Sequence, residues 1–318
     1  MLSSFGPIGS DLSPERKTFA ASLCRADLHL HSIYSGSGHL RAPRLRSGLP
    51  EPEALYRAAR ARGMSLVTLT DLDTIDGCLA FLDGHPGTRD FFISEEVLAA
   101  EPRSGALVSV LIFGLDEGQH RDIQGLKCDV HDVAAYARAA GLPASLGSLL
   151  PVLEAGGSEG LVRELIQAFD RFEIRNGAED RACNELMARL VQQAAAGRSF
   201  GVTAGSNAHV AARAGRTATV ARAAGREEFF EALRENRTWA AGEHGRAWAS
   251  FAEVLRHVPL SRAAQPLVDR AMTRARRSAR ARQAKRRLDL IDILRFQEKA
   301  KSYRGTGRRA NPGSGEAH

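Results

Sequence analysis

The sequence predicts a mixed α/β fold in the form of a barrel, with strands on the inside and helices on the outside. Segments typical of strands and of helices alternate along most of the chain, and the connections between them are too short to hold a separate domain. No G-x-G-x-x-G turn follows the first strand and no G-x-x-x-x-G-K-S/T loop occurs, so a nucleotide-binding open sheet is less favoured. Polar residues come directly after several predicted strands, which is where barrel enzymes carry their catalytic residues.

The individual elements follow from the spacing of apolar residues. After a first strand near residue 26, β-branched runs predict strands over 65–71, 91–97, 107–115, 171–176 and 200–205. Apolar positions three and four apart predict helices over 51–64, 129–141, 160–169, 182–197 and 227–237. Glycines end three of these helices: Gly63, Gly141 and Gly197. The alternation of strand and helix predicts parallel strands throughout.

The first strand contains the segment ADLHLHSIYS (26–35), in which Asp27, His29 and His31 alternate with leucines. Alternate side chains of an extended strand point to opposite faces, so the acid and both imidazoles are expected side by side. Imidazoles with a carboxylate form a common ligand set for Zn, Mn or Fe. A histidine on a strand is more often an ordinary surface or core residue, so this triplet needs partners elsewhere in the chain.

The same alternation selects candidate partners from later strands. In FFISEEVL (91–98), Glu95 shares a face with apolar residues, whereas Glu96 points to the other face and toward the barrel mouth. In TAGSNAH (203–209), Gly205 permits a tight exit from the strand, and Asn207 and His209 are expected to point back over it.

The bulk composition is that of a globular protein. Of the 318 residues, 43% are hydrophobic and 25% are charged. No apolar run approaches the ~20 residues of a membrane helix, and the N-terminus does not predict a secretory signal. Four scattered cysteines without a C-x-x-C pair indicate a reducing, cytoplasmic location. Abundant alanine, arginine and glycine indicate a bacterial source.

Charge divides the chain into parts. Residues 270–309 hold 15 Lys or Arg and 3 Asp or Glu, whereas the whole chain carries +7, so the remainder is mildly acidic. This stretch predicts a basic helix that binds a polyanion, such as nucleic acid or an anionic membrane surface, or else a solvated extension. We predict a flexible leader (1–24), a barrel domain (25–245), a basic helical extension (246–304) and a disordered tail (305–318).

Four motifs occur in a fixed order: DLHLHSIYS (27–35), TDLDTIDG (70–77), ISEEV (93–97) and GSNAH (205–209). They resemble the motifs of the polymerase and histidinol phosphatase (PHP) superfamily. The resemblance covers the barrel domain and implies a distorted (β/α)7 PHP barrel with metal-dependent phosphoesterase activity.

The resemblance also implies the residues of a site. His29, His31 and His209 would be metal ligands, and Glu96 would be a carboxylate that can bridge two metal ions. Asn207 would be a weak ligand through its amide oxygen, and Asp71 would stand beside the ligand at the end of the second strand. The implied cofactor is a divalent metal, either Mn, Zn or Fe.

The sequence departs from the family pattern at four positions, namely Gly36, Leu72, Ser148 and Asn207. The family has acids or histidines there. Leu72 has no lone pair to donate, and Asn207 brings no negative charge. We therefore expect fewer metal ions than the family's usual set.

Two functions of different class follow. The first is a phosphoesterase with a depleted metal site, acting on a small phosphorylated substrate or nucleotide. For this function Arg175 and Arg216 are candidates to hold the phosphate, although each could equally form a surface ion pair. The second is a catalytically inactive PHP-fold protein with a binding or regulatory role.

Overall fold

The structure, a computed structural model, describes residues 23–35, 49–149, 152, 158–195 and 197–245. All of these residues belong to the first of the two units of the chain, Met1–Pro259. Most of the expected leader, the loop with Gly36, the basic extension with its polyanion site and the tail lie outside the described residues. These remain predictions.

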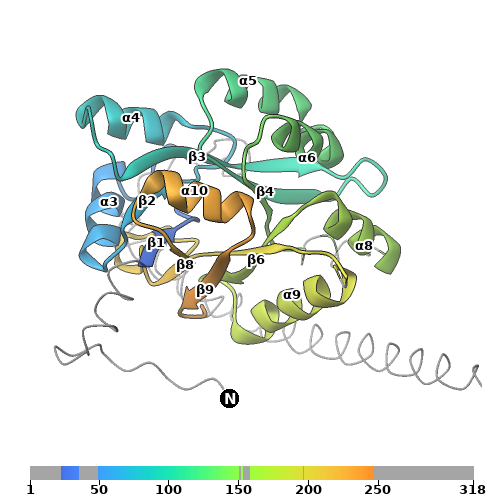
Figure 1. Cartoon of the computed structure of the whole chain (residues 1–318). Helices are drawn as coiled ribbons and strands as arrows, with labels where there is room; N and C mark the ends of the chain where they lie inside the picture. Colours follow the sequence, from blue (N-terminus) through green and yellow to red (C-terminus); the bar gives the residue numbers. More distant parts are fainter. Residues whose placement is uncertain (1–22, 36–48, 150–151, 153–157, 196, 246–318) are drawn as a thin grey trace, which may run out of the picture. The chain divides into compact units, whose positions relative to one another are not determined.

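Eight strands form a closed ring at the centre of this part of the chain (Figure 1). They follow one another in chain order, β8 also pairs with β1, and β9 pairs with β8. The strands are β1 (Leu23–Asp27), β2 (Leu66–Leu69), β3 (Phe91–Ala100), β4 (Leu107–Phe113), β5 (Ala144–Leu146), β6 (Arg171–Asn176), β7 (Gly201–Gly205), β8 (Thr217–Arg222) and β9 (Thr238–Gly242). The helices are α3 (Pro52–Ala61), α4 (Asp76–Gly84), α5 (Glu117–Leu126), α6 (Val130–Ala139), α8 (Glu159–Ala168), α9 (Arg181–Ala194) and α10 (Arg226–Arg234), with the short 3₁₀ helix η1 (Ala211–Arg213). The predicted α/β barrel is confirmed.

The strands do not all run parallel, which corrects the sequence prediction. β1, β2 and β3 are parallel neighbours, as are β5, β6 and β7, but β4 is antiparallel to β3 and β5, and β8 is antiparallel to β7 and β1. Only six residues join β3 to β4. A parallel crossover needs a dozen or more, so this pair forms a hairpin. The sequence analysis also missed β5, β8, β9, α4 and α5.

Local sequence signals explain where the helices begin. The side chains of Asp116, Asp129, Ser158 and Asp180 cap the N-termini of α5, α6, α8 and α9, respectively. In α5, Asp116 and Gln119 form a reciprocal capping box. None of the helices in the described ranges is both long and apolar enough to span a bilayer.

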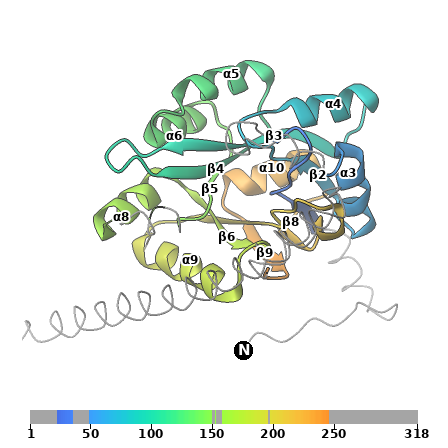
Figure 2. The same ribbon diagram turned by 180° about the vertical axis from the view of Figure 1, so that it is seen from behind.

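Helix α10 closes one end of the barrel (Figures 1 and 2). Its Phe229, Phe230 and Leu233 pack in one buried cluster with side chains from several strands, among them Leu28 and Phe113. This apolar plug lies at the end where β1 begins, because β8 leads into α10 and pairs with β1 from Leu23 onward. We call the opposite end, where β1, β2, β6 and β7 terminate, the mouth.

Arg198 links the end of α8 to the approach to β7. Its guanidinium donates to the carbonyl oxygens of Ile166 (2.8 Å), Gln167 (3.2 Å) and Phe169 (2.8 Å) and to the carboxylate of Asp170 (3.2 Å). The last carbonyls of a helix have no partner within the helix and carry negative partial charge, so a planar cation with several donors satisfies them.

We predict that Arg198→Lys lowers the free energy of unfolding by about 2 kcal/mol, because an ammonium group cannot reproduce the fork of donors. Urea denaturation followed by circular dichroism measures this change. Arg189→Lys, at an exposed position on α9, is the matched control and should alter stability by less than about 0.5 kcal/mol. Equal effects of the two substitutions would contradict this role of Arg198.

Candidate metal centre

β1 ends at Asp27, so the two histidines lie in the segment that follows this strand. The Asp27 carboxylate is fully buried and accepts hydrogen bonds from the backbone N–H groups of His29 (3.3 Å), Ser206 (2.8 Å) and Gly215 (2.8 Å). Burial raises the pKa of Asp27 to about 6 even though these bonds favour the ionised form. Asp27 therefore ties β1 to the segments after β7 and fixes the backbone that carries His29, instead of lying among the imidazoles.

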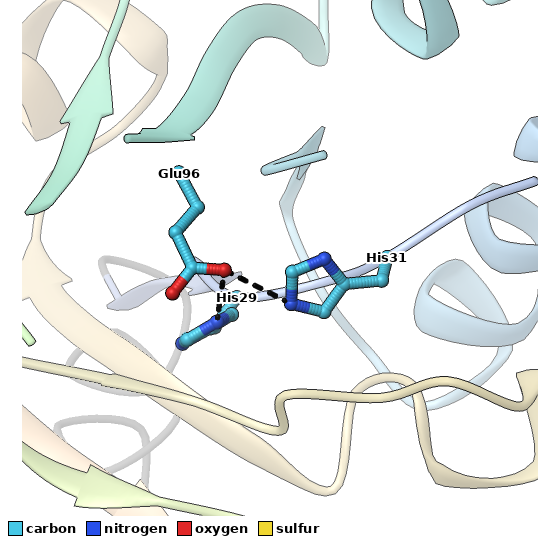
Figure 3. A group of neighbouring side chains, drawn as sticks. All are labelled: His29, His31 and Glu96. Atoms are coloured by element: carbon cyan, nitrogen blue, oxygen red, sulfur yellow. Dashed lines mark ion pairs between the residues drawn. The ribbon is translucent and has the colours of Figure 1, made fainter. Parts of the chain in front are cut away.

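His29, His31 and Glu96 converge at the mouth (Figure 3). One ligand atom from each lies within 4.8 Å of the others, and we call these three residues the His–Glu cluster. A carboxylate oxygen of Glu96 is 3.6 Å from Nε2 of His29 and 3.4 Å from Nε2 of His31. Both imidazoles are buried, and the Glu96 side chain is 12% exposed.

The spacing of the cluster fits a single cation. Zinc lies about 2.0–2.2 Å from nitrogen and oxygen ligands, so ligand atoms of a tetrahedral site are roughly 3.4 Å apart. Nε2 of His29 is buried and has no hydrogen-bond partner among the described residues. An unpartnered buried polar atom is costly, and a cation would supply the missing partner.

The electrostatics of the cluster also favour a cation. Burial raises the pKa of Glu96, but the neighbouring His29 and His31 outweigh this and lower it to about 2. Burial lowers the pKa of His29, yet the charges of Glu173 and Glu96 hold it well above its usual value. At His31, burial and the neighbouring His209 hold the pKa well below the usual value. His29 thus lies between two carboxylates, whose negative charge a divalent cation would compensate.

Hydroxyl groups hold two members of the cluster. Ser109 on β4 donates to the second carboxylate oxygen of Glu96. Ser35 lies 3.1 Å from Nδ1 of His31 and accepts a hydrogen bond from the backbone N–H of Leu72. These contacts orient Glu96 and His31 through the second Glu96 oxygen and through Nδ1 of His31, which are not the atoms that these residues turn toward one another.

Glu173 on β6 is a further candidate site residue, which the sequence analysis missed. Its carboxylate lies 2.8 Å from Nδ1 of His29, and its side chain is 1% exposed. The signal was present in RFEIRN (171–176), where a single acid stands between Phe172 and Ile174. The alternation argument that selected Glu96 would have selected Glu173 as well.

Asn207 and His209 lie beside the cluster without joining it. The rings of His209 and His31 have centroids 4.5 Å apart, and His209 Nδ1 is 3.2 Å from the carbonyl oxygen of Asn207. Asn207 adopts a left-handed backbone with φ of 47°, which asparagine tolerates better than most residues. Its Oδ1 is buried and has no hydrogen-bond partner in the described chain, so this amide oxygen is available to a cation.

Leu72 and Asp71 follow β2 on the edge of the cluster. Leu72 forms an isolated parallel bridge with Glu96, so an alkyl side chain occupies the position where the family pattern has histidine. Both oxygens of Asp71 accept from Ser32, one from the backbone N–H and one from the hydroxyl, each at 2.6 Å. Burial raises the pKa of Asp71 to about 6. Asp71 thus holds the chain directly after His31.

Arg175 and Arg216 form their contacts with residues outside the cluster. Arg175 donates to the carbonyl oxygen of Gly242 (3.2 Å), and Arg216 pairs with Glu243 (3.3 Å). The register of β6 against β7 shifts between Glu173 and Arg175, which inserts one extra residue. Such a bulge reverses the alternation of faces, so Arg175 does not share the inward direction of Glu173. A bulge of this kind has no signature in the sequence.

Comparison with known proteins finds likeness to short parts of the chain. Residues 188–238 match the family model described as PHP-associated. An uncharacterised protein of Methanocaldococcus jannaschii is 36% identical over 53 residues, which are 17% of this chain and 31% of that relative's length, so the chain matches less than a third of it.

Two solved structures show the extent of the structural likeness. The crystal structure of PsfC from Pseudomonas syringae superposes with a TM-score of 0.51 at 14% identity, covering 74% of this chain and 96% of PsfC. A candidate metal-dependent phosphoesterase from Bifidobacterium adolescentis gives a TM-score of 0.43 at 14% identity, covering 59% and 88%, respectively. The first likeness shows a shared fold.

We predict that Gly205→Ala disturbs the cluster through the backbone. A methyl group at Gly205 would lie 2.3 Å from Cβ and 2.5 Å from the backbone nitrogen of His29. The overpacking should lower the unfolding free energy by about 1–3 kcal/mol, and the shift of His29 should weaken zinc binding measured by isothermal titration calorimetry.

The control for this substitution is Gly125→Ala in α5, where an added methyl group has no atom within 4 Å. This change should leave zinc binding unaltered and be neutral or slightly stabilising, because alanine favours helices. Wild-type zinc affinity in Gly205→Ala would contradict the close packing of β7 against His29.

Proposed function

We propose that the chain belongs to the PHP superfamily, which the match of residues 188–238 to the PHP-associated family model supports, and that it is a metal-dependent phosphoesterase whose cation is held by His29, His31 and Glu96. One observation carries the proposal. Nε2 of His29 is buried with no hydrogen-bond partner among the described residues and lies 3.6 Å from the Glu96 carboxylate, while a second carboxylate, that of Glu173, holds its Nδ1. An ordinary core histidine would have both ring nitrogens satisfied.

The donor set suits a divalent Mn, Zn or Fe ion, because it combines two imidazoles with one carboxylate. Such an ion, when bound, lowers the pKa of its water and polarises a phosphoryl group. The residues of the chain orient the ligands: Ser109 fixes Glu96, Ser35 contacts His31, and the Asn207 amide oxygen is a further ligand. We propose a single ion, since Leu72 offers no lone pair. The substrate class is a small phosphorylated molecule or a nucleotide.

The remaining candidates have different parts in this proposal. His209 acts as a ligand only if its ring turns from its contact with Asn207. Asp71 is a positioning residue, because its oxygens hold Ser32. Arg175 and Arg216 would have to leave Gly242 and Glu243 to reach a phosphate.

A catalytically inactive PHP-fold protein is the second candidate. The bridge between Leu72 and Glu96 favours it, because an aliphatic side chain takes a position at which the family pattern supplies a ligand. With a single ion, the attacking and leaving oxygens of the phosphate cannot both be clamped by metal. Such a protein would retain the cation for binding or regulation.

Metal analysis of the purified full chain, combined with hydrolysis of p-nitrophenyl phosphate, tests the proposal. We expect one Mn, Zn or Fe ion per chain and hydrolysis that depends on it. His29→Ala should lower metal affinity by at least about tenfold and abolish turnover, because a ligand is lost. His131→Ala, on α6 beside Glu164, is the control and should change neither property.

The outcomes separate the two candidates. Stoichiometric metal without hydrolysis of phosphate esters would support the inactive protein. A wild-type chain that binds no metal, with hydrolysis unchanged in His29→Ala, would refute the metal-dependent phosphoesterase.

A further inference from the structure

We infer that Asn176 and Glu173 form a hydrogen-bond relay of fixed polarity, on a backbone that Asn184 holds, which makes His29 donate through Nδ1 and present the lone pair of Nε2 to the cation. The inference rests on the proposed function only in naming the cation as recipient of that lone pair. Glu173 is a positioning residue in this relay, since it acts through His29.

Asn184 in α9 holds the backbone of Asn176, and the orientation of its own amide is fixed by backbone partners. Its Oδ1 accepts from the N–H of Asn176 (2.7 Å), and its Nδ2 donates to the carbonyl oxygens of Asn176 (3.0 Å) and Glu179 (3.1 Å). A backbone N–H can only donate and a backbone carbonyl can only accept. Turning this buried amide over would therefore place its NH₂ group against the N–H of Asn176 and its oxygen against the two carbonyl oxygens.

Asn176, the last residue of β6, sets the polarity of the relay, because its side-chain amide has a backbone partner of its own. Its Oδ1 accepts from the backbone N–H of Ala178 (2.9 Å), which leaves Nδ2 to donate to Glu173 Oε2 (2.8 Å). The amide cannot turn over, because its NH₂ group would then oppose the N–H of Ala178. Glu173 is consequently required to be an acceptor at Oε2.

Glu173 in turn determines which nitrogen of His29 carries the proton. Its other oxygen, Oε1, lies 2.8 Å from Nδ1 of His29. An ionised carboxylate has no proton to give, so the ring must donate through Nδ1. Nε2 then holds the lone pair of the neutral ring and faces the Glu96 oxygen at 3.6 Å (Figure 3). Metal-binding histidines commonly donate their other N–H to a carboxylate in this way, which fixes ring and tautomer.

His31 has no comparable constraint. Its Nδ1 lies 3.1 Å from the Ser35 hydroxyl, and a hydroxyl both donates and accepts. The two histidines of the motif are therefore unequal: His29 has a tautomer set by the fold, whereas His31 is free to adopt either. The relay also explains why asparagine rather than another polar residue occupies positions 176 and 184, since each must accept from one backbone group and donate to another partner.

The test of the relay uses two full-length variants and zinc alone as the probe. Glu173→Gln keeps the shape, but its single NH₂ group must face either His29 Nδ1 or Asn176 Nδ2, both of which are donors. We expect zinc to bind about 10- to 100-fold more weakly. The double variant Glu173→Gln/Asn176→Asp exchanges acid and amide, restores a donor opposite an acceptor, and should recover most of this loss.

A purely structural role for Glu173 would not predict recovery in the double variant. Wild-type zinc affinity in Glu173→Gln, or no recovery on adding Asn176→Asp, would overturn the relay. Thermal unfolding of all three proteins shows whether a loss of affinity merely reflects unfolding.

Nuclear magnetic resonance of the wild-type chain, labelled with ¹⁵N-histidine, gives a readout that needs no metal. We expect a protected proton on Nδ1 of His29 both with and without zinc. A His29 ring protonated at Nε2 alone would overturn the relay even if the variants fail to fold. Failure of the wild-type chain to bind zinc or manganese would instead count against the proposed function. The relay would then be tested by the Nδ1 proton signal of His29 alone.

Discussion

Burial of ionisable groups at the mouth of the barrel is the constraint on which the site depends. His29, His31, Glu96 and Glu173 are withdrawn from water, and each must find a partner or carry the cost of lost solvation. Three of them do so through serine, asparagine or one another. His29 does so at Nδ1 through Glu173, but its Nε2 has no hydrogen-bond partner in the part of the chain that the structure describes, and the surrounding negative charge makes a cation the partner that would satisfy it. The same burial strengthens the electrostatic interactions within the site, because charges interact more strongly away from water.

Buried acids at this end of the barrel fall into two groups. Asp27 and Asp71 accept hydrogen bonds from N–H and hydroxyl groups of neighbouring segments, so they hold the backbone on either side of the histidines. Glu173 and Glu96 face the imidazoles themselves, one at Nδ1 and one at Nε2 of His29. A carboxylate that lies near the site is therefore not necessarily a ligand. The groups that its oxygens contact determine whether it holds the backbone or faces the imidazoles.

Regular strands made much of this site predictable from the sequence. Along β3 the alternation holds, so Glu95 packs outward against His120 and Gln124 of α5 while Glu96 joins the histidines. Along β6 the alternation fails, because the extra residue between Glu173 and Arg175 reverses the faces. The strand β4 was predicted, but its antiparallel direction was not, because the turn that makes a hairpin lies in a short polar segment with no apolar spacing to mark it. Hydrogen-bond polarity, as in Asn176 and Asn184, depends on partners that only the folded chain brings together.

Anomalous X-ray diffraction from crystals grown with zinc tests the central claim most directly. The account predicts one zinc peak about 2.0–2.2 Å from Nε2 of His29, Nε2 of His31 and a carboxylate oxygen of Glu96, with Glu173 still bonded to Nδ1 of His29. A structure in which zinc binds elsewhere and these three side chains remain without a shared ion would contradict it.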